Sequence, residues 1–325
     1  MKVYISRNIP TEAINLLKEQ GLSVTVNENS TLLSKNELID ACQGVDLLLN
    51  VAHADLDAAF LEACPSLKGI ALASVGYDHI DLTAASKHNI AVSNTPDVLS
   101  EATADTAFLL MLAVSRKAFH RANQVRLGQW KDFEFMQDLG IELYGKTLGI
   151  YGLGRIGIAL ARKAQAAYNM NIIYHNRSRN LEAEKLLQAR YVSFDDLLTQ
   201  SDVISAHSFL SPETTYRFNA DAFKRMKSSA IFINTARGKI HQEADLTAAL
   251  QNGEIWGAGL DVTDPEPMLA NNPLLDLPNV CVLPHIGSAT IETRTQMALL
   301  AASNLIAVKN GVPMPQILNP EIYKG

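Results

Sequence analysis

The sequence predicts an α/β protein built from parallel sheets that are covered by helices on both faces. Short apolar runs alternate with helical patterns along nearly the whole chain, which is typical of parallel strands joined by helices. Two of these runs, residues 45–49 and 69–73, are almost entirely apolar, as expected for strands buried on both faces. At about 150 residues per domain, the 325 residues leave room for two domains.

The first hundred residues contain five expected strands. We place these strands near residues 2–6, 22–26, 45–51, 69–73 and 90–92. Helices are expected between them, for example over residues 11–20 and 35–42. A long helix then begins near Ser100, where Asp97 and Glu101 place negative charge at the positive end of the helix dipole, and it runs to about residue 118.

A second series of strands and helices begins at Lys146. Strands are expected over residues 147–151, 171–175, 203–206, 230–234, 257–261 and 280–283. Helices are expected over residues 182–188, 194–198, 221–226 and 244–251. A last helix spans about 290–309 and ends at Asn310-Gly311 with Pro313 just after, which is a common stop signal.

The composition argues against several classes of protein. The chain carries 28 basic and 34 acidic residues, for a net charge of −6, and has no basic run, which disfavours nucleic acid or an anionic membrane as a partner. The longest apolar stretch, residues 107–114, is too short to span a bilayer. The first residues lack the apolar core of a signal peptide. The three cysteines are scattered, so we expect reduced thiols, no metal site and a cytoplasmic location.

The segment Gly152-Leu153-Gly154-Arg155-Ile156-Gly157 matches the pattern G-x-G-x-x-G. An apolar strand precedes it and a helix follows, which is the context that a dinucleotide pyrophosphate requires. Gly152 permits the tight turn, Gly154 lets the backbone approach the phosphates, and Gly157 lets the helix and strand pack closely. The helix N-terminus presents free N–H groups to the anion. The alternative, a purely structural turn, is disfavoured by this context.

The residues after the following strand bear on which dinucleotide is bound. Asn176 lies 19 residues after Gly157, where a site that prefers NAD usually has Asp or Glu. Arg177, Ser178 and Arg179 follow. A carboxylate would repel a 2′-phosphate, whereas an uncharged Asn beside two guanidinium groups and a hydroxyl would bind one. We therefore predict that NADP(H) is preferred over NAD(H). The alternative is that both arginines are solvated loop charges.

Arg237, Glu266 and His285 each lie in a loop after one of the last three expected strands. Ligands of an open α/β sheet bind outside the carboxyl ends of its strands, so these loops would bring a cation, a carboxylate and an imidazole to one crevice. Taken singly, each residue has an ordinary structural interpretation. Together with the dinucleotide turn, they indicate a catalytic site.

This combination suits hydride transfer to a 2-keto acid. Reduction of the carbonyl places a proton on oxygen as hydride arrives at carbon, and His is the natural proton donor near neutral pH. A carboxylate bonded to the imidazole orients the ring and stabilises its charged form. An arginine binds the keto acid bidentately and polarises its carbonyl. The hydride itself belongs to the nicotinamide.

At these residues the sequence resembles the D-isomer-specific 2-hydroxyacid dehydrogenase family. It is similar in particular to the glyoxylate/hydroxypyruvate reductases, a group that includes 2-ketogluconate reductases. The matching segments occur in the family's order and spacing, and they are Gly152–Gly157, Asn234–Gly238, Gly259–Pro267 and Pro284–Thr290. The resemblance implies an enzyme with two Rossmann-like, doubly wound parallel-sheet domains and a cleft between them.

The resemblance also implies an activity and its residues. The expected activity is NADPH-preferring reduction of glyoxylate, hydroxypyruvate or 2-ketogluconate to a D-2-hydroxy acid. Arg237 and His285 would bind the substrate, His285 would donate the proton, and Glu266 would pair with His285. The N–H groups of Val75 and Gly76 would bind the substrate carboxylate. The further cofactor contacts would be Thr103, Arg155, Ile156, Thr235, Ser288 and Asp261, the last of which would bind the nicotinamide carboxamide.

The domain plan implied by the resemblance is interleaved. A discontinuous substrate-binding domain would comprise residues 1–99 and 289–325, and the dinucleotide-binding domain would comprise residues 100–288. Enzymes of this kind are commonly homodimers. The helix from Ser100 and the arm over residues 118–139 would form the contact between the two copies.

Two departures from the family pattern stand out. Many members have a His-x-Pro-Leu segment where this chain has His207-Ser208-Phe209-Leu210, so we expect the contacts near the adenine to differ. Many have Val-Asp a few residues after the catalytic arginine, where this chain has His241-Gln242, so no carboxylate is expected there. Neither departure touches the three catalytic positions.

Two other functions fit part of the sequence. Dinucleotide-sensing transcriptional corepressors have a similar fold with similar Arg, Glu and His residues, and in them binding matters rather than turnover. A dehydrogenase of a substrate other than a keto acid, such as phosphite, is the other alternative. Turnover with a 2-keto acid would decide for the reductase.

Overall fold

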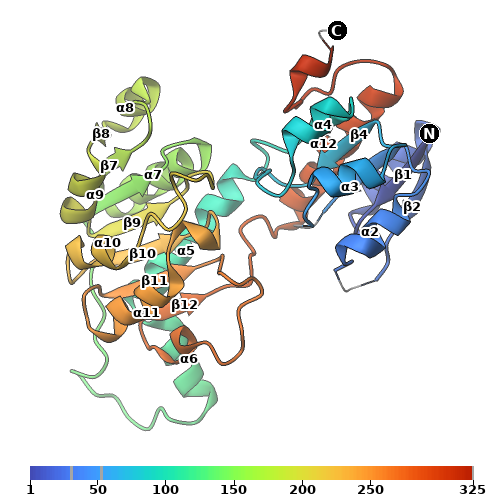
Figure 1. The fold of residues 1–325 in the computed structure, drawn as a ribbon. Helices are drawn as coiled ribbons and strands as arrows, with labels where there is room; N and C mark the ends of the chain where they lie inside the picture. The colour runs from blue at the N-terminus through green and yellow to red at the C-terminus, as the bar shows by residue number, and fades with distance from the viewer. Residues whose placement is uncertain (30–31, 52–53, 324–325) are drawn as a thin grey trace. The chain divides into compact units, whose positions relative to one another are not determined.

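The computed structural model describes residues 1–29, 32–51 and 54–323, and it divides into two compact units. Unit 1 comprises Met1–Leu99 and Ala289–Gly325, and unit 2 comprises Ser100–Ser288. Each unit contains one sheet whose strands all run parallel, with helices packed on it (Figure 1). The predicted α/β class is therefore confirmed. Within the described residues, no helix is long and apolar enough to cross a membrane.

Unit 1 contains a five-stranded sheet with the order β2-β1-β3-β4-β5. The elements of this unit are β1 (Lys2–Ile5), α1 (Thr11–Glu19), β2 (Ser23–Val26), α2 (Lys35–Ala41), β3 (Leu47–Asn50), α3 (Ala58–Ala63), β4 (Gly69–Leu72), α4 (Leu82–Lys87), β5 (Ala91–Ser93), α12 (Ile291–Lys309) and the 3-10 helix η3 (Pro320–Tyr323). All four residues of the central strand β3 are buried, as are those of β4. This matches the two apolar runs from which these strands were predicted.

The short helices of unit 1 begin where a side chain satisfies their first N–H groups. Ser34 caps α2 and accepts from the N–H of Glu37, whose carboxylate accepts from Ser34 in return. Asp57 and Asp81 cap α3 and α4 in the same way, by accepting from an N–H of the first turn. Such caps stabilise helices that are too short to persist alone.

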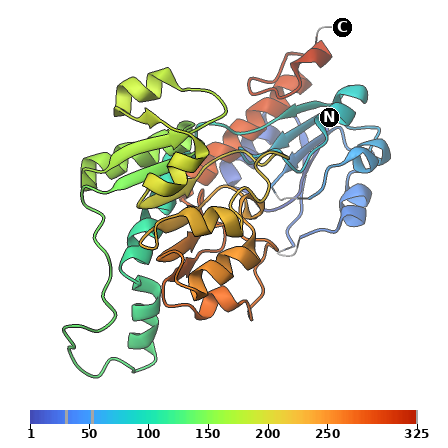
Figure 2. The same ribbon diagram turned by 60° about the vertical axis from the view of Figure 1, so that its left-hand side comes forward.

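Unit 2 contains a seven-stranded sheet with the order β12-β11-β10-β9-β6-β7-β8. The elements of this unit are α5 (Ser100–Ser115), α6 (Ala118–Arg126), β6 (Thr147–Tyr151), α7 (Arg155–Tyr168), β7 (Asn171–His175), α8 (Leu181–Leu187), β8 (Arg190–Tyr191), α9 (Phe194–Gln200), β9 (Val203–Ala206), α10 (Ala220–Arg225), β10 (Ile231–Asn234), η1 (Gly238–Ile240), α11 (Glu243–Gln251), β11 (Gly257–Leu260), η2 (Pro273–Asp276) and β12 (Val280–Val282). The turned view in Figure 2 shows this sheet together with the helices of the same unit that pack on it.

The sheet of unit 2 is buried on both faces because its strand residues alternate between two apolar clusters. On β10, Ile231 and Ile233 pack in the cluster that includes residues of α5 and α7. Phe232 lies between them in the chain and packs on the other face, in the cluster that includes residues of α9, α10 and α11. Strands covered in this way need apolar residues at every position, which explains why their runs were visible in the sequence.

The strand order reverses beside β6. The chain runs outward from β6 through β7 to β8, and it then returns to β9 and runs outward the other way to β12. In open sheets with such a reversal, the loops that leave the two strands diverge, and ligands bind between them at the carboxyl edge. The predicted cofactor and catalytic residues of unit 2 follow these strand ends.

Candidate active site

The glycine turn connects β6 to α7 at the point of strand reversal. Gly152 has a φ of +99°, and a Cβ there would lie 2.6 Å from the backbone nitrogen of Ser208, so no other residue fits without displacement. Gly154 is the N-cap residue of α7, and a Cβ there would meet nothing within 4 Å. Among the described residues, no side chain caps this 14-residue helix. Its first N–H groups are therefore available to an anion.

The loop after β7 is fastened to this glycine turn by side-chain amides. Asn176 accepts a hydrogen bond at Oδ1 from the N–H of Leu153, at 2.6 Å. The carbonyl of Leu153 accepts from the side-chain amide of Asn180 at 3.2 Å and from that of Asn176 at 3.4 Å. Asn176 thus holds the loop beside the turn, a role that was not predicted from the sequence.

Arg177, Ser178 and Arg179 lie between these two asparagines, and all three are exposed. Arg179 donates from Nη2 to Oε2 of Glu184 at 2.6 Å, within an ion pair. The three side chains are accessible to a ligand at the carboxyl end of β7. This is the position at which the sequence predicted a 2′-phosphate.

A buried carboxylate holds the turn that contains His285. Asp261 follows β11, and its two oxygens accept from the N–H groups of Ile286 and Gly287, both at 2.8 Å. Burial raises the pKa of Asp261, and the two N–H groups offset only part of that rise. His285 has a φ of +54°, which is uncommon for a residue with a side chain. We infer that Asp261 stabilises the backbone that places His285.

Two predicted cofactor residues make internal contacts at the same edge. Thr103, in the first turn of α5, donates from its hydroxyl to the carbonyl of Gly287 at 3.2 Å. The hydroxyl of Thr235 lies 3.4 Å from Nδ1 of His207, whose Nε2 lies 2.8 Å from the hydroxyl of Ser205. Desolvation lowers the pKa of His207 to about 4, so this ring is neutral at neutral pH. Of the other predicted contacts, Arg155 and Ile156 begin α7 and Ser288 is the last residue of unit 2.

His285 and Glu266 form a direct pair. Nδ1 of His285 lies 2.6 Å from Oε1 of Glu266, and the side chains remain 33% and 36% exposed. The other carboxylate oxygen accepts from the N–H of Thr263 at 3.4 Å, and the Thr263 hydroxyl donates to the carbonyl of Pro265 at 2.8 Å. The carboxylate is therefore held by its own loop while it contacts the imidazole.

The loop that carries Arg237 is held by a buried amide. Asn234, the last residue of β10, accepts from the N–H of Ala236 at 3.0 Å and donates to the carbonyl of Arg237 at 2.8 Å. Its amide nitrogen also lies 3.0 Å from Nδ1 of His241. Both Asn234 and His241 are fully buried, and burial lowers the pKa of His241 to about 4. The neutral ring therefore accepts the second amide hydrogen.

Sequence reasoning did not identify Asn234 and His241 as parts of the site. His241 was noted only as a departure from the family pattern. No periodicity or spacing in the sequence identifies His241. It meets Asn234 only because the turn between the two residues brings them together. From sequence alone, a single histidine of this kind is interpreted as a packing residue.

The arginine loop (residues 235–240) and the glutamate loop (residues 262–267) are pressed together at Gly238. A Cβ on Gly238 would overlap the carbonyl of Thr263 and lie 2.8 Å from the backbone nitrogen of Asp264. The two loops therefore hold a fixed position relative to each other. The side chains of Arg237 and Glu266 depend on this contact for their relative placement.

Tyr216 ties the same two loops from outside. Its N–H donates to the carbonyl of Lys239 in the arginine loop at 2.7 Å. Its hydroxyl donates to Oδ2 of Asp264 in the glutamate loop at 2.9 Å. One residue therefore contacts both loops through hydrogen bonds, in addition to the close approach at Gly238.

Val75 and Gly76, the residues predicted to bind a substrate carboxylate, lie in unit 1 after β4. The carbonyl of Gly76 accepts from the hydroxyl of Ser74 at 2.7 Å. The carbonyl of Val75 accepts from the side-chain amide of Asn94 at 2.8 Å. These bonds engage both carbonyl groups and fix the conformation of the loop.

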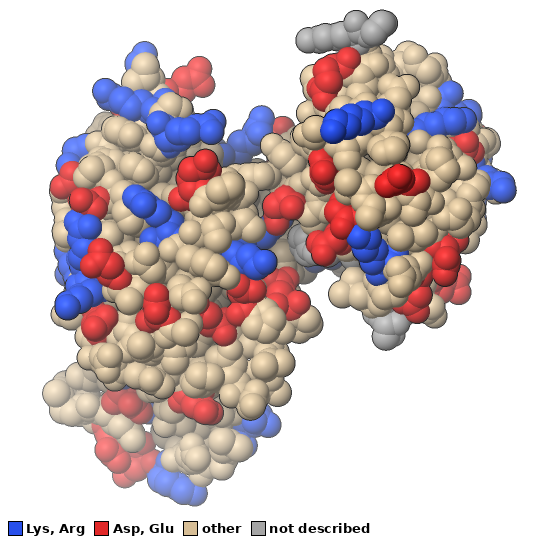
Figure 3. Space-filling view, in the orientation of Figure 1, with Lys and Arg blue, Asp and Glu red and all other residues tan. Residues whose placement is uncertain are grey.

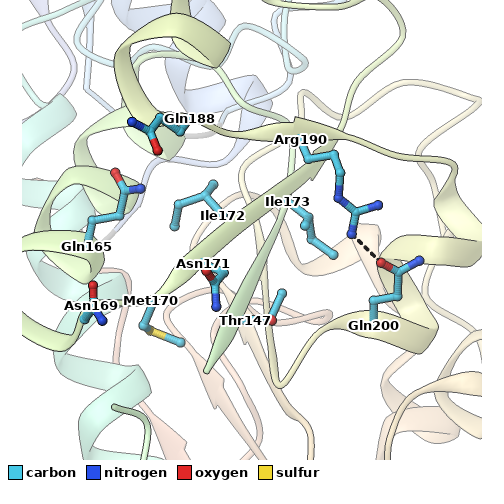
Figure 4. A pocket seen from close by; sticks show the side chains of 10 residues that line it. All are labelled: Thr147, Gln165, Asn169, Met170, Asn171, Ile172, Ile173, Gln188, Arg190 and Gln200. Atoms are coloured by element: carbon cyan, nitrogen blue, oxygen red, sulfur yellow. Dashed lines mark hydrogen bonds between the residues drawn. The ribbon is translucent and has the colours of Figure 1, made fainter. Parts of the chain in front are cut away.

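A hollow of about 550 Å³ lies at the opposite, amino edge of the sheet in unit 2 (Figure 4). Five of its ten lining residues carry side-chain amides, and the hollow lies around the starts of β6, β7 and β8. Arg190 and Gln200 are hydrogen-bonded across one side of it. Ligands of open α/β sheets bind at the carboxyl ends of the strands. This hollow is therefore separate from the site described above.

Comparison with known proteins identifies relatives of the whole chain. Residues 108–287 match the family model described as D-isomer specific 2-hydroxyacid dehydrogenase, NAD binding domain. The glyoxylate reductase of Pyrococcus furiosus is 43% identical over 99% of this chain and 96% of its own. A crystal structure of a protein from Thermus thermophilus has a TM-score of 0.92 and 42% identity, covering 98% of this chain and 100% of its own.

A third relative was solved with ligands. It is the NADPH-dependent glyoxylate/hydroxypyruvate reductase of Sinorhizobium meliloti, in complex with NADP and malonate. Its TM-score is 0.85 and its identity 31%, and the match covers 98% of this chain and 96% of that one. The resemblance that the sequence motifs indicated is therefore confirmed over the full length.

The close approach at Gly238 predicts a loss of stability on substitution. In Gly238→Ala, the added methyl group must push the arginine and glutamate loops apart, and we expect a loss of about 1–3 kcal/mol in the free energy of unfolding. Urea denaturation followed by circular dichroism measures it. Lys239→Ala is the matched control, because Lys239 is exposed and adjacent. An unchanged midpoint in Gly238→Ala would show that the loops are not held at this contact.

Proposed function

Because the chain belongs to the D-isomer-specific 2-hydroxyacid dehydrogenase family, we propose that it reduces small 2-keto acids to D-2-hydroxy acids with a nicotinamide dinucleotide. The family makes it an oxidoreductase. The observation that carries the chemistry is the 2.6 Å contact between His285 and Glu266 at the carboxyl edge of the sheet. That edge also holds the glycine turn, so a proton donor and a cofactor-binding turn belong to the same unit.

The residues of the glycine turn fit a dinucleotide. Gly152 is required by its backbone conformation, Gly154 leaves its surroundings open, and α7 begins without a side-chain cap among the described residues. We propose that the pyrophosphate binds to the first N–H groups of α7. When bound, the nicotinamide supplies the hydride.

The protein's own residues supply the proton and the orientation. Since Glu266 contacts Nδ1 of His285, the proton passes to the substrate carbonyl oxygen from Nε2. The carboxylate stabilises the imidazolium and fixes the ring. Arg237 binds the keto acid and polarises its carbonyl. The N–H groups of Val75 and Gly76 bind its carboxylate, as the family resemblance implies.

NADP(H) is the preferred cofactor in this proposal, with NAD(H) as the weaker one. Support comes from an uncharged Asn176 and from two exposed arginines and an exposed serine in the loop that Asn176 fastens to the glycine turn. The solved Sinorhizobium meliloti relative carries NADP. The remaining cofactor contacts are proposed at Thr103, Thr235, Asp261 and Ser288.

The substrate class is proposed from the relatives. The names of these relatives specify glyoxylate and hydroxypyruvate, and both compounds are small 2-oxo acids. An arginine and two backbone N–H groups would hold such an acid. 2-Ketogluconate is the larger candidate that the family resemblance adds. A ranking of these three compounds would define the pocket's size limit.

A homodimer is proposed from the surface of the arm. Residues 118–139 follow α5 and expose large apolar side chains, with Phe133, Phe135 and Met136 between 72% and 81% exposed. Trp130 is 68% exposed in the same segment. Such a concentration of exposed apolar surface is typical of a subunit contact.

The proposed activity is tested by following NADPH and NADH oxidation with glyoxylate, hydroxypyruvate and 2-ketogluconate in parallel. We expect turnover with at least one compound and a kcat/KM for NADPH at least tenfold above that for NADH. Equal values for the two cofactors would contradict the NADPH assignment. Tight dinucleotide binding without turnover of any keto acid would favour a sensor.

The role of His285 predicts a loss of turnover without a loss of cofactor binding. In His285→Ala the proton donor is removed, and we expect kcat to fall on the order of 10²–10⁴-fold. The dissociation constant of NADPH, measured by nicotinamide fluorescence, should stay within about twofold, because the imidazole is not part of the phosphate site. A kcat close to that of the wild type would refute the proposed role.

The pairing of Glu266 with His285 predicts a change in the pH dependence of reduction. The proposed proton donor is the protonated imidazole, so kcat for reduction falls towards high pH. In Glu266→Gln the neutral amide no longer stabilises the charged ring, so kcat should begin to fall at a lower pH than in the wild type. The pH–kcat profile from pH 5 to 9 measures it. A pH–kcat profile identical to that of the wild type would mean that Glu266 does not act through the imidazole.

A further inference from the structure

The Arg179 side chain is held in one orientation by a carboxylate. Its Nε donates to Oε1 of Glu184 at 3.0 Å, and its Nη2 donates to Oε2 at 2.6 Å. This is a bidentate pair, in which two parallel hydrogen bonds fix the plane of the guanidinium as well as its position. Glu184 is the more buried partner, with 15% of its side chain exposed against 59% for Arg179.

Glu184 is itself anchored to the core by Tyr174. The Tyr174 hydroxyl donates to Oε1 of Glu184 at 2.6 Å and accepts from the N–H of Asn180 at 2.8 Å. Tyr174 belongs to β7 and is fully buried. Its hydroxyl therefore connects a strand of the sheet to the carboxylate on α8 and to the end of the loop that carries Arg179.

The glycine turn is fixed to the other side of this loop. Asn176 and Asn180 bind the backbone of Leu153, as described above. The loop over residues 176–180 is thus attached to the turn by two amides and to β7 by the Tyr174 hydroxyl. Arg179 projects from a backbone that is tied at both ends, and Glu184 removes most of the remaining freedom of its side chain.

We propose that Glu184 and Tyr174 are positioning residues that determine cofactor specificity, because they hold the Arg179 guanidinium ready for the 2′-phosphate of NADP(H). This inference rests on the proposed preference for NADP(H). In this arrangement, neither Glu184 nor Tyr174 contacts the phosphate. Both act through Arg179.

The donors that Glu184 leaves on Arg179 suit a phosphate. A guanidinium has five N–H groups, of which Glu184 uses one on Nε and one on Nη2. Three N–H groups remain, and the two of them along the Nη1–Nη2 edge match two oxygens of a phosphate. Hydrogen bonding from Arg179 and Tyr174 lowers the pKa of Glu184 to about 2, so the pair stays ionised at neutral pH.

The Arg179–Glu184 pair changes the affinity for the 2′-phosphate through two opposing effects. Holding Arg179 in place removes part of the rotamer entropy that a free arginine loses on binding. The negative charge of Glu184 opposes a phosphate nearby, but this effect is weak because Arg179 is largely exposed and screened by solvent. We therefore expect ordering to exceed repulsion. Basic side chains gather at the α8 end of unit 2, which adds a favourable field for an anion (Figure 3).

The test compares binding of NADPH and NADH to the full chain without a keto acid, by nicotinamide fluorescence. In Glu184→Ala the dissociation constant of NADPH should rise about fivefold to tenfold, while that of NADH stays within about twofold. Tyr174→Phe, which removes one hydroxyl, should raise the NADPH value by about twofold to fourfold. Glu184→Gln keeps a hydrogen-bond acceptor but not the charge. Its dissociation constant for NADPH should lie between those of Tyr174→Phe and Glu184→Ala.

Glu182→Ala is the matched control. Glu182 is an exposed carboxylate in the first turn of the same helix, so its removal changes the net charge equally. Its NADPH affinity should equal that of the wild type. The double variant Arg179→Ala/Glu184→Ala should bind NADPH no more weakly than Arg179→Ala, because Glu184 acts only through Arg179. Melting temperatures of all variants separate these effects from unfolding.

The outcomes separate this inference from the proposed function. Loss of NADPH affinity in Arg179→Ala without a change in Glu184→Ala or Glu184→Gln would overturn the inference alone. Tighter NADPH binding in Glu184→Ala would also overturn it, since the carboxylate would then compete with the phosphate. Equal affinities of the wild type for NADPH and NADH would refute the proposed cofactor preference and this inference together.

Discussion

The uniform direction of the strands is the constraint on which the site depends. Every strand pair in the seven-stranded sheet is parallel, so every strand delivers its following loop to one edge. The glycine turn follows β6, the arginine loop follows β10, and the glutamate loop follows β11. An antiparallel strand among them would have sent its loop to the far edge, where the amide-lined hollow lies. Parallel pairing therefore assembles the site before any side chain acts.

Bringing loops to one edge does not yet fix their side chains, and buried polar groups do that. Asp261 accepts two N–H groups in the turn of His285, and Asn234 bridges the backbone of the arginine loop. Both side chains are almost fully buried, so a broken hydrogen bond would leave a polar group without water to replace it. This penalty makes the arrangement rigid. His285 and Arg237 therefore take their backbone geometry from these buried anchors.

The sequence was sufficient for the fold class, the family and the central strands, because apolar runs and glycine spacing are local signals. It was not sufficient where the chain returns on itself. The two-residue strand β8 is too short to show a pattern. The helix expected to run from Ser100 to about residue 118 ends at Ser115, and a second helix begins after Lys117, whose φ is +51°. The buried contact of Asn234 with His241 likewise depends on a turn that no spacing rule describes.

The loops at the carboxyl edge are held in two different ways, and substitutions affect them differently. The loops of Arg237 and His285, which carry proposed catalytic residues, are held by buried groups bonded to backbone, so a substitution there disturbs packing as well as the site. The loop with Arg179 is held by amides that bind the glycine turn and by an ion pair to α8 whose arginine is exposed. Substitutions on α8 can therefore alter the loop proposed to bind the cofactor's ribose end while the contact between His285 and Glu266 stays intact. In the proposed function, the fold thus separates the residues assigned to proton transfer from the residues assigned to cofactor selection.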